Sequence, residues 1–233
     1  MLCGIGRFSV LSLIAPSFWN WSVSVAMAAK SKPLILPKPD HAGRMPLEEA
    51  LRTRRSVRSF GDGPVPLQDL SQLLWAAQGT TDPTGLRAAP SAGALYPLVV
   101  YAVAGNVASL PAGLYRYDPS AHALSLVQAG DRRAELSGAA LRQDWIGGAA
   151  VSLVVAALFR RTTAKYGDRG VRYVHMEAGH VAQNIYLQAT ALHLGTTVVG
   201  AFQDDRLNAV LGLPADEDPL CILPVGRPAA AGR

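Results

Sequence analysis

The sequence contains only two cysteines, Cys3 and Cys221, and this scarcity excludes two classes of protein. A disulfide framework needs several paired cysteines, and a cysteine-rich metal site needs clustered ones. Charged residues are also few, at 17% of the chain. Long apolar runs are lacking as well: beyond the first 29 residues, no stretch approaches the ~20 apolar residues that a membrane helix requires. We therefore expect no disulfide-stapled fold, no structural zinc and no membrane span in the body of the chain.

Apolar residues, in contrast, make up 49% of the 233-residue chain. A single domain of this length buries roughly 70% of its unfolded surface, so one compact, soluble domain is expected. The net charge of +5 is a small excess, mostly arginine, which permits an anionic partner. Because no basic run is interleaved with aromatic residues, the pattern does not favour nucleic acid.

The first 29 residues differ from the rest of the chain. Their only charge is Arg7, residues 8–14 are largely apolar, and residues 26–28 have the small-x-small form of a signal-peptidase site. The alternatives to a signal peptide are a disordered leader and an upstream start, with Met27 as the true first residue. Residues 30–45 contain three prolines among lysines, which predicts an extended linker that separates this leader from the fold.

Hydrophobic periodicity predicts an α+β domain over residues 46–228, followed by a short tail at 229–233. Apolar residues repeating at three and four indicate helices, and short β-rich runs indicate strands. Gly79 stands where a left-handed cap would end one helix. The expected helices cover residues 46–55, 66–78, a segment starting near 131, 171–194 and 204–211; the expected strands cover 98–104, 114–117, 124–127, 149–159, 196–199 and 220–225.

Alternating polar side chains follow the first predicted helix. In an extended segment, Arg54, Ser56 and Arg58 fall on one side. Two guanidiniums and a hydroxyl on one face suit a phosphate dianion, because arginine forms charge-assisted bonds to phosphate oxygens. The alternative is a solvated basic helix end.

Two further stretches could contact a ligand. Residues 90–97 are bounded by prolines and contain small residues, which allows close approach of a flat molecule. Residues 200–202 follow a buried strand, where backbone amides commonly meet ligands. Taken alone, each stretch is more typical of an ordinary loop or turn than of a ligand site.

Together, these stretches resemble the FMN-dependent nitroreductase superfamily, and within it the SagB-type branch that contains the azoline dehydrogenases. The resemblance covers roughly residues 45–228. It is carried by the order and spacing of residues 54–60, 90–97, 113–119, 165–184 and 199–202.

This resemblance implies a nitroreductase-like α+β fold with three α/β/α layers, in which helices flank a central, mainly antiparallel sheet. It also implies a homodimer with FMN at the subunit interface, each site drawing on both chains. Arg54, Ser56 and Arg58 would hold the FMN phosphate, with Arg227 as an addition. Backbone donors near the isoalloxazine would come from one chain and a loop lining the flavin from the other. The full set of cofactor-binding residues expected on this basis is Arg54, Arg55, Ser56, Arg58, Pro90, Ser91, Ala92, Gly93, Val199, Gly200, Ala201 and Arg227.

Lys165 and Tyr166 match the Lys-Tyr pair that azoline dehydrogenases use in catalysis. Oxidising an azoline removes a hydride from one ring carbon and a proton from its neighbour, so a base must stand beside the flavin. Lysine can serve if its pKa is lowered, and tyrosine can relay or orient the proton. The alternative is a snorkelling lysine beside a packed ring. Ala94 and Tyr96 depart from the Asn and Gln of many nitroreductases, which weakens the transfer of nitro or quinone reduction.

These observations leave three candidate functions. The first is a SagB-type FMN oxidoreductase that oxidises or reduces a small carbon–nitrogen or conjugated substrate, which could be peptide-derived, by hydride transfer through flavin N5; azoline-to-azole dehydrogenation is one candidate reaction. The second is an NAD(P)H-dependent nitro or quinone reductase, and the third is a flavin-binding protein without turnover. Localisation stays open, slightly favouring the cytoplasm, because a chain exported unfolded would have to find FMN outside it.

A metal site is not expected. His175 and Glu177 point to different faces of their predicted helix, so with His180 they offer only a pair of ligands.

Overall fold

The computed structural model describes residues 32–230. The predicted signal peptide or leader at 1–29 lies outside these residues. Within them, no helix is both long and apolar enough to cross a membrane.

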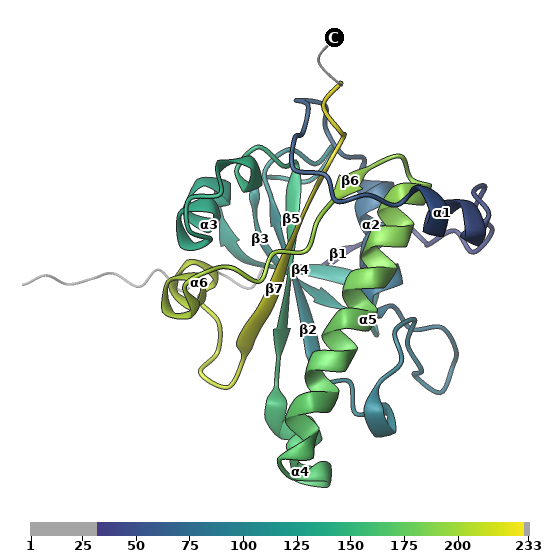
Figure 1. The fold of residues 1–233 in the computed structure, drawn as a ribbon, viewed down its shortest axis with the longest axis vertical. Coiled ribbons are helices and arrows are strands. Elements are labelled where there is room, and N and C mark those ends of the chain that lie inside the picture. Colours follow the sequence, from purple (N-terminus) through teal and green to yellow (C-terminus); the bar gives the residue numbers. More distant parts are fainter. Residues whose placement is uncertain (1–31, 231–233) are drawn as a thin grey trace, which may run out of the picture.

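A seven-stranded sheet forms the centre of the molecule, with strand order β1-β4-β3-β2-β5-β7-β6 (Figure 1). Every neighbouring pair is antiparallel. Every residue of β2 and of β5 is buried, which makes these two strands the middle of the core. The strands are β1 Leu34–Ile35, β2 Leu98–Ala104, β3 Gly113–Asp118, β4 Ala123–Ala129, β5 Val151–Ala157, β6 Gly195–Thr196 and β7 Asp218–Gly226.

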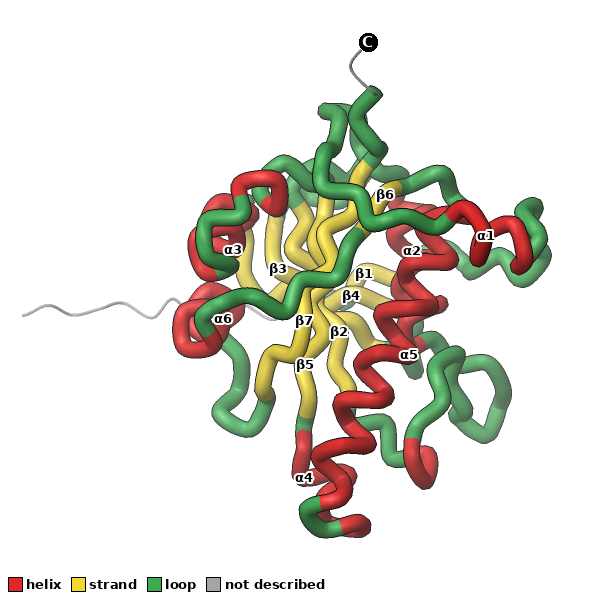
Figure 2. The backbone as a smooth tube through the Cα atoms, viewed as in Figure 1, coloured by secondary structure: helices red, strands yellow, loops and turns green. Residues whose placement is uncertain are grey.

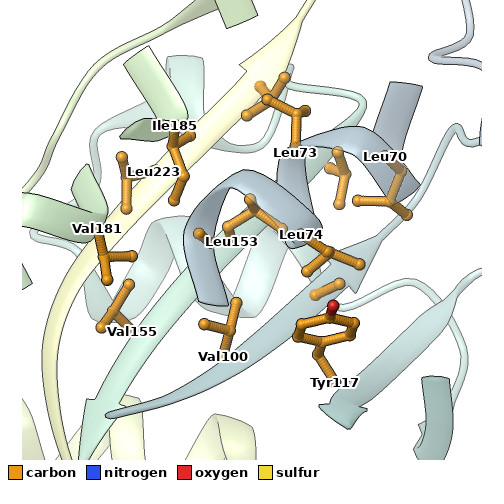
Figure 3. Close-up of a cluster of buried hydrophobic side chains, with 14 of the residues drawn as sticks. Leu70, Leu73, Leu74, Val100, Tyr117, Leu153, Val155, Val181, Ile185 and Leu223 are labelled. Atoms are coloured by element: carbon orange, nitrogen blue, oxygen red, sulfur yellow. The ribbon is translucent and has the colours of Figure 1, made fainter. Parts of the chain in front are cut away.

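Helices cover both faces of the sheet, giving the three predicted layers (Figure 2). On one face, α2 and α5 pack over side chains such as Val100 and Leu153, in the larger of two apolar clusters (Figure 3). On the other face, α3 and α6 pack over a second cluster that includes Val154 and Ile222. The helices are α1 Leu47–Thr53, α2 Leu67–Gln78, α3 Arg133–Ala139, α4 Phe159–Tyr166, α5 Arg169–Ala191 and α6 Asp204–Leu211. The predicted α+β nitroreductase-like fold is confirmed.

One helix was not predicted. The apolar run at 149–159 indicates a single strand, but β5 ends at Ala157 and α4 begins at Phe159. Leu158 and Phe159 continue the apolar pattern because both pack against the core clusters. Apolar character alone does not mark where a buried strand becomes a helix.

The described part of the predicted linker at 30–45 begins at residue 32, and from Leu34 onward it is not separate from the fold. Strand β1 pairs with β4, and Leu36 is only 4% exposed. The Ser71 hydroxyl donates to the Pro37 carbonyl at 2.6 Å. This segment therefore completes one edge of the sheet, which corrects the expected domain start at residue 46.

Gly79 ends α2 but is not left-handed, with φ at −62°. Its role is close approach, because a Cβ there would lie 2.2 Å from the Trp75 side chain. The expected left-handed cap is wrong, and the requirement for glycine has a steric cause.

Candidate functional site

Helix α5 separates two groups of functional residues. About two and a half helical turns lie between Glu177 and Tyr186, so these two buried side chains leave opposite sides of the helix. Between them, α5 presents an exposed face that includes Met176 and Gly179. Figure 1 shows α5 in front of the sheet, between β7 and the long loop that follows α2. We call the two sides the Tyr186 flank and the Glu177 flank.

On the Tyr186 flank, the Tyr186 side chain contacts residues from two other segments of the chain. Its hydroxyl lies 3.0 Å from Ser56 Oγ, donates to Thr197 Oγ1 at 3.2 Å and accepts from the Val198 N–H at 2.9 Å. The Arg54 guanidinium lies over its ring, 5.1 Å from the centroid. Burial raises the pKa of Tyr186, but these hydrogen bonds and the Arg54 charge outweigh burial and leave the pKa lowered.

Backbone pairing explains how Ser56 reaches Tyr186. The Val57 N–H donates to the Thr196 carbonyl at 2.9 Å, which fixes the segment after α1 beside β6. Gly195 permits this approach, because a Cβ there would lie 2.6 Å from Val57 Cγ1. The Arg54–Ser56 segment is therefore positioned by a strand contact from far along the chain.

The other arginines predicted to bind the cofactor, Arg58 and Arg227 at its phosphate and Arg55 without a stated role, contact other groups. Arg55 turns back and donates to the carbonyls of Arg52 and Arg54, at 3.1 and 2.8 Å. Arg58 lies over the Trp145 ring, 5.9 Å from its centroid. Arg227 Nε donates to the Pro64 carbonyl at 3.3 Å. Of the four predicted arginines, Arg54 is the one whose guanidinium lies against Tyr186.

The segment Val199–Ala201 continues the Tyr186 flank. Val199 and Ile222 exchange both backbone hydrogen bonds, at 2.8 and 2.9 Å. Gly200 is exposed, and no atom would come within 4 Å of a Cβ placed on it. Within residues 32–230, the N–H groups of Gly200 and Ala201 have no hydrogen-bond acceptor.

A groove of about 380 Å³ runs along this side of α5. Small side chains from α5 form much of its floor. Its lining residues are His175, Ala178, Gly179, Ala182, Gln183, Tyr186, Val198, Leu220 and Cys221.

On the other side, the loop at 90–97 meets Lys165 and Tyr166. A Cβ on Gly93 would lie 2.7 Å from the Tyr166 hydroxyl and 3.0 Å from Lys165 Nζ, and Gly93 has φ +62°. The backbone conformation favours glycine here, and the close contacts show that the turn packs directly against the polar ends of Lys165 and Tyr166. Lys165 is exposed, and its Nζ lies 5.4 Å from the Tyr166 ring centroid. The structure brings together two predicted stretches that are about 70 residues apart in sequence.

The same loop holds strained backbone. Ala94 and Tyr96 have φ values of +53° and +47°, which L-residues rarely adopt. The Ser91 hydroxyl accepts from the Tyr96 N–H at 2.9 Å and closes the turn. Strain of this kind costs on the order of 1–3 kcal/mol per residue and persists where the surroundings hold it, often at functional sites.

Three polar residues of α5 hold the start of this loop. Asn184 Nδ2 donates to the Ala88 carbonyl at 3.4 Å, and His180 Nδ1 lies 3.3 Å from the Pro90 carbonyl. One turn earlier, Glu177 is 2% exposed and faces Ser91. Sequence reasoning tested Glu177 and His180 only as metal ligands and missed this role. Their spacing with Asn184, which places all three on one side of a helix, was the signal for a positioning role.

Glu177 is a buried carboxyl with an unsatisfied oxygen. Its Oε1 has no hydrogen-bond partner in the described part of the chain, and neither has Nε2 of the buried Gln78. Burial raises the pKa of Glu177, and Ser91, Gln78, Arg87 and His180 oppose that shift without cancelling it.

A Glu177→Gln substitution is expected to change the pH dependence of stability. Because its pKa is raised in the folded state, Glu177 binds a proton there at pH values where the unfolded chain has released it. Its contribution is therefore lost as pH rises from the ordinary value of 4.5 through the raised pKa. Urea unfolding across this window should show the variant gaining stability relative to wild type as pH increases. Glu48→Gln, on an exposed residue of α1, is the control; a constant difference at all pH values would contradict the prediction.

Comparison with known proteins gives the family. The nitroreductase family model matches residues 51–227. The chain belongs to the nitroreductase family. It is 48% identical over 181 residues to the predicted nitroreductase MJ1384 of Methanocaldococcus jannaschii, which covers 78% of this chain and 90% of that protein. It is also 30% identical over 155 residues to the microcin B17-processing protein McbC of Escherichia coli, covering 63% of this chain and 56% of McbC.

Solved structures agree with this assignment. A predicted nitroreductase from Ralstonia eutropha superposes with a TM-score of 0.75 at 37% identity, over 85% of this chain and 90% of that one. A chain of the Escherichia coli microcin synthetase McbBCD complex, with truncated pro-MccB17 bound, superposes with a TM-score of 0.64 at 25% identity, over 85% of this chain and 78% of that one. The protein is therefore a nitroreductase-family oxidoreductase.

Members of the family generally use FMN, and the residues on the Tyr186 flank fit such a group. A guanidinium and a hydroxyl are available for a phosphate, and two backbone N–H groups are free to donate. The groove beside these groups is lined partly by small side chains of α5, which leave space for the cofactor.

Proposed function

We propose that this protein is an FMN-dependent oxidoreductase of the SagB type that oxidises an azoline ring to an azole. The observation that carries the proposal is the packing of Gly93 against Lys165 Nζ and the Tyr166 hydroxyl. Similarity to McbC and to a chain of the microcin synthetase complex supports the same chemistry. A Lys-Tyr pair held against a glycine-containing loop is positioned for reaction with a flat ring, whereas a snorkelling lysine needs no such loop.

The Tyr186 flank would hold the cofactor. Arg54 and Ser56 would bind the FMN phosphate, with Tyr186 fixing both by its ring and hydroxyl. The free N–H groups of Gly200 and Ala201 would donate to the edge of the isoalloxazine. Such donors stabilise the reduced, more electron-rich ring. FMN, when bound, supplies a hydride acceptor at N5.

Lys165 would take the proton. Azoline oxidation breaks two ring C–H bonds, and one of them would lose a hydride, for which bound FMN would be the acceptor. The other bond releases a proton, which Lys165 Nζ accepts while the Tyr166 hydroxyl orients the amine. A positioned base of this kind contributes about 10²–10⁴-fold to a rate.

A complete site would need two copies of the chain. Within one chain, Lys165 and the loop at 90–97 belong to the Glu177 flank, whereas Arg54 and Gly200 belong to the Tyr186 flank. A second copy packed on the exposed face of α5 would bring its Glu177 flank to the Tyr186 flank of the first. Nitroreductases are typically dimers, which is consistent with this arrangement.

The second candidate is an NAD(P)H-dependent nitro or quinone reductase. The similarity to the predicted nitroreductases of M. jannaschii and R. eutropha favours it. This chemistry would use the same flavin site but would not require a base at Lys165.

The test is the visible spectrum of the purified chain, followed by assay on a thiazoline-containing peptide. We expect flavin absorption bands, release of about one FMN per chain on heating, and conversion of the thiazoline to a thiazole, detected as a loss of two hydrogens by mass spectrometry. Flavin with nitroarene reduction but no thiazole would favour the second candidate. A colourless protein that also fails to bind added FMN would exclude both.

A further inference from the structure

A cavity of about 280 Å³ lies where β2 and β3 diverge. The pairing between these strands ends at Tyr101 and Arg116, so the preceding residues of β2 pair only with β5 and line the cavity on the side where β3 has diverged. Residues from α2, from the loop that follows it and from α4 close the cavity. Its lining is Gln78, Arg87, Leu98, Val99, Val100, Arg116, Tyr117, Asp118, Pro119, Ser125 and Arg161.

Three guanidiniums line this small cavity, and only one of them is neutralised. Arg116 pairs with Glu217 at 3.2 Å. Within residues 32–230, Arg87 and Arg161 form no salt bridge with a carboxylate. The one lining carboxylate is Asp118, whose Oδ1 accepts from both the backbone N–H and the hydroxyl of Ser120, at 2.9 and 2.6 Å.

Arg87 and Arg161 are held in place by neutral groups. Arg87 Nη1 donates to Gln78 Oε1 at 2.8 Å, and its guanidinium lies 4.5 Å from the Tyr96 ring centroid. Arg161 Nη1 donates to the Tyr96 carbonyl at 3.0 Å. Each guanidinium uses one N–H in these contacts and keeps others free to bind a ligand. Tyr96 therefore fixes two cations beside one cavity.

Arg87 carries its charge in an unfavourable setting. Burial lowers the pKa of Arg87, and repulsion from the Arg161 charge lowers it too, whereas Tyr96, Glu177 and Tyr117 oppose the shift. An anion bound between the guanidiniums would relieve this repulsion. Guanidiniums fixed before binding also lose little side-chain entropy when they bind a planar or tetrahedral oxyanion.

We propose that the Arg87–Arg161 cavity binds the oxyanion group, carboxylate or phosphate, of a small ligand. The volume suits such a group with a few attached atoms rather than a whole nucleotide. The cavity is distinct from the Tyr186 flank, because Arg161 and Tyr96 lie on the Glu177 flank, on the opposite side of α5. Lys165 does not line the cavity but follows Arg161 by one helical turn on α4.

The proposal is tested by calorimetric titration of the full chain with inorganic phosphate and, separately, with succinate, at constant ionic strength. We expect saturable binding of at least one probe, and the probe that binds identifies the source of the oxyanion. Arg161→Gln should weaken that binding about tenfold, the usual effect of losing a charge-assisted hydrogen bond. Arg87→Lys keeps the positive charge but loses the forked guanidinium that can donate two hydrogen bonds to one oxyanion, so it should also weaken binding of the probe.

Arg160→Gln is the matched control, because Arg160 is an exposed neighbour on α4 that does not line the cavity. It removes the same charge and should leave binding unchanged. Equal weakening by Arg160→Gln, or no binding of either probe, would overturn the proposal. The proposal would also be overturned if Arg54→Ala lost phosphate binding while Arg161→Gln kept it, because the phosphate would then occupy the Tyr186 flank. None of these readouts depends on flavin turnover, so the result stands apart from the proposed function.

Discussion

Replacing Lys165 with alanine is expected to lower azoline oxidation by about 10²–10⁴-fold while FMN stays bound. Lys165 Nζ would accept the ring proton, and no other lysine of the described chain stands beside the Gly93 turn. Reduction of a nitroarene by the same variant should change little, since that reaction needs no base at this position. The measurement is thiazole formation and nitroarene reduction on one preparation, with flavin content taken from its spectrum.

Two further variants test whether the effect is specific to the Lys165 amine. Tyr166→Phe keeps the ring that packs edge-to-face on Tyr173, at 5.1 Å between centroids, and removes only the hydroxyl. It should lose less activity than Lys165→Ala if the hydroxyl only orients the amine. Arg160→Ala removes a neighbouring exposed charge and should behave as wild type. Equal loss of both reactions in Lys165→Ala, with flavin retained, would show that Lys165 is not a specific base for azolines.

The Arg54→Ala variant is expected to bind FMN about 10- to 100-fold more weakly than wild type. Its guanidinium would make charge-assisted hydrogen bonds to the phosphate, each worth about 1.5–3 kcal/mol. Because Arg54 lies over the Tyr186 ring and Ser56 contacts the Tyr186 hydroxyl, the double variant with Ser56→Ala should not be additive. Fluorescence titration of the apoprotein with FMN measures both effects.

Riboflavin is the discriminating control for this second experiment. It lacks the phosphate, so its affinity should be the same in Arg54→Ala and in wild type. Arg52→Ala, an exposed charge in the last turn of α1, should leave the affinity for both flavins unchanged. If Arg54→Ala weakens riboflavin and FMN equally, Arg54 supports the fold and does not bind the phosphate.

Much of the fold followed from local patterns. The repeat of leucines at three and four residues predicted α2 to within one residue of its observed bounds, and the apolar run at 98–104 matched β2. Both patterns report which side of an element faces the core, and that property is encoded within a single segment. The missed elements, β1 and α4, are short or continue a neighbour's apolar pattern.

The candidate site divides in the same way. Sequence alone determined the family resemblance and the stretches that carry it, because motifs are read along the chain. Only the tertiary structure decided which of these residues meet. It placed Arg54 rather than Arg55 against Tyr186, and set Gly93 against Lys165 and Tyr166. It also set Glu177 against Ser91 of the loop at 90–97, and left Arg87 and Arg161 without a carboxylate partner among residues 32–230 beside one cavity. These contacts join segments far apart in sequence, and their geometry depends on how the helices pack on the sheet, which no single segment encodes.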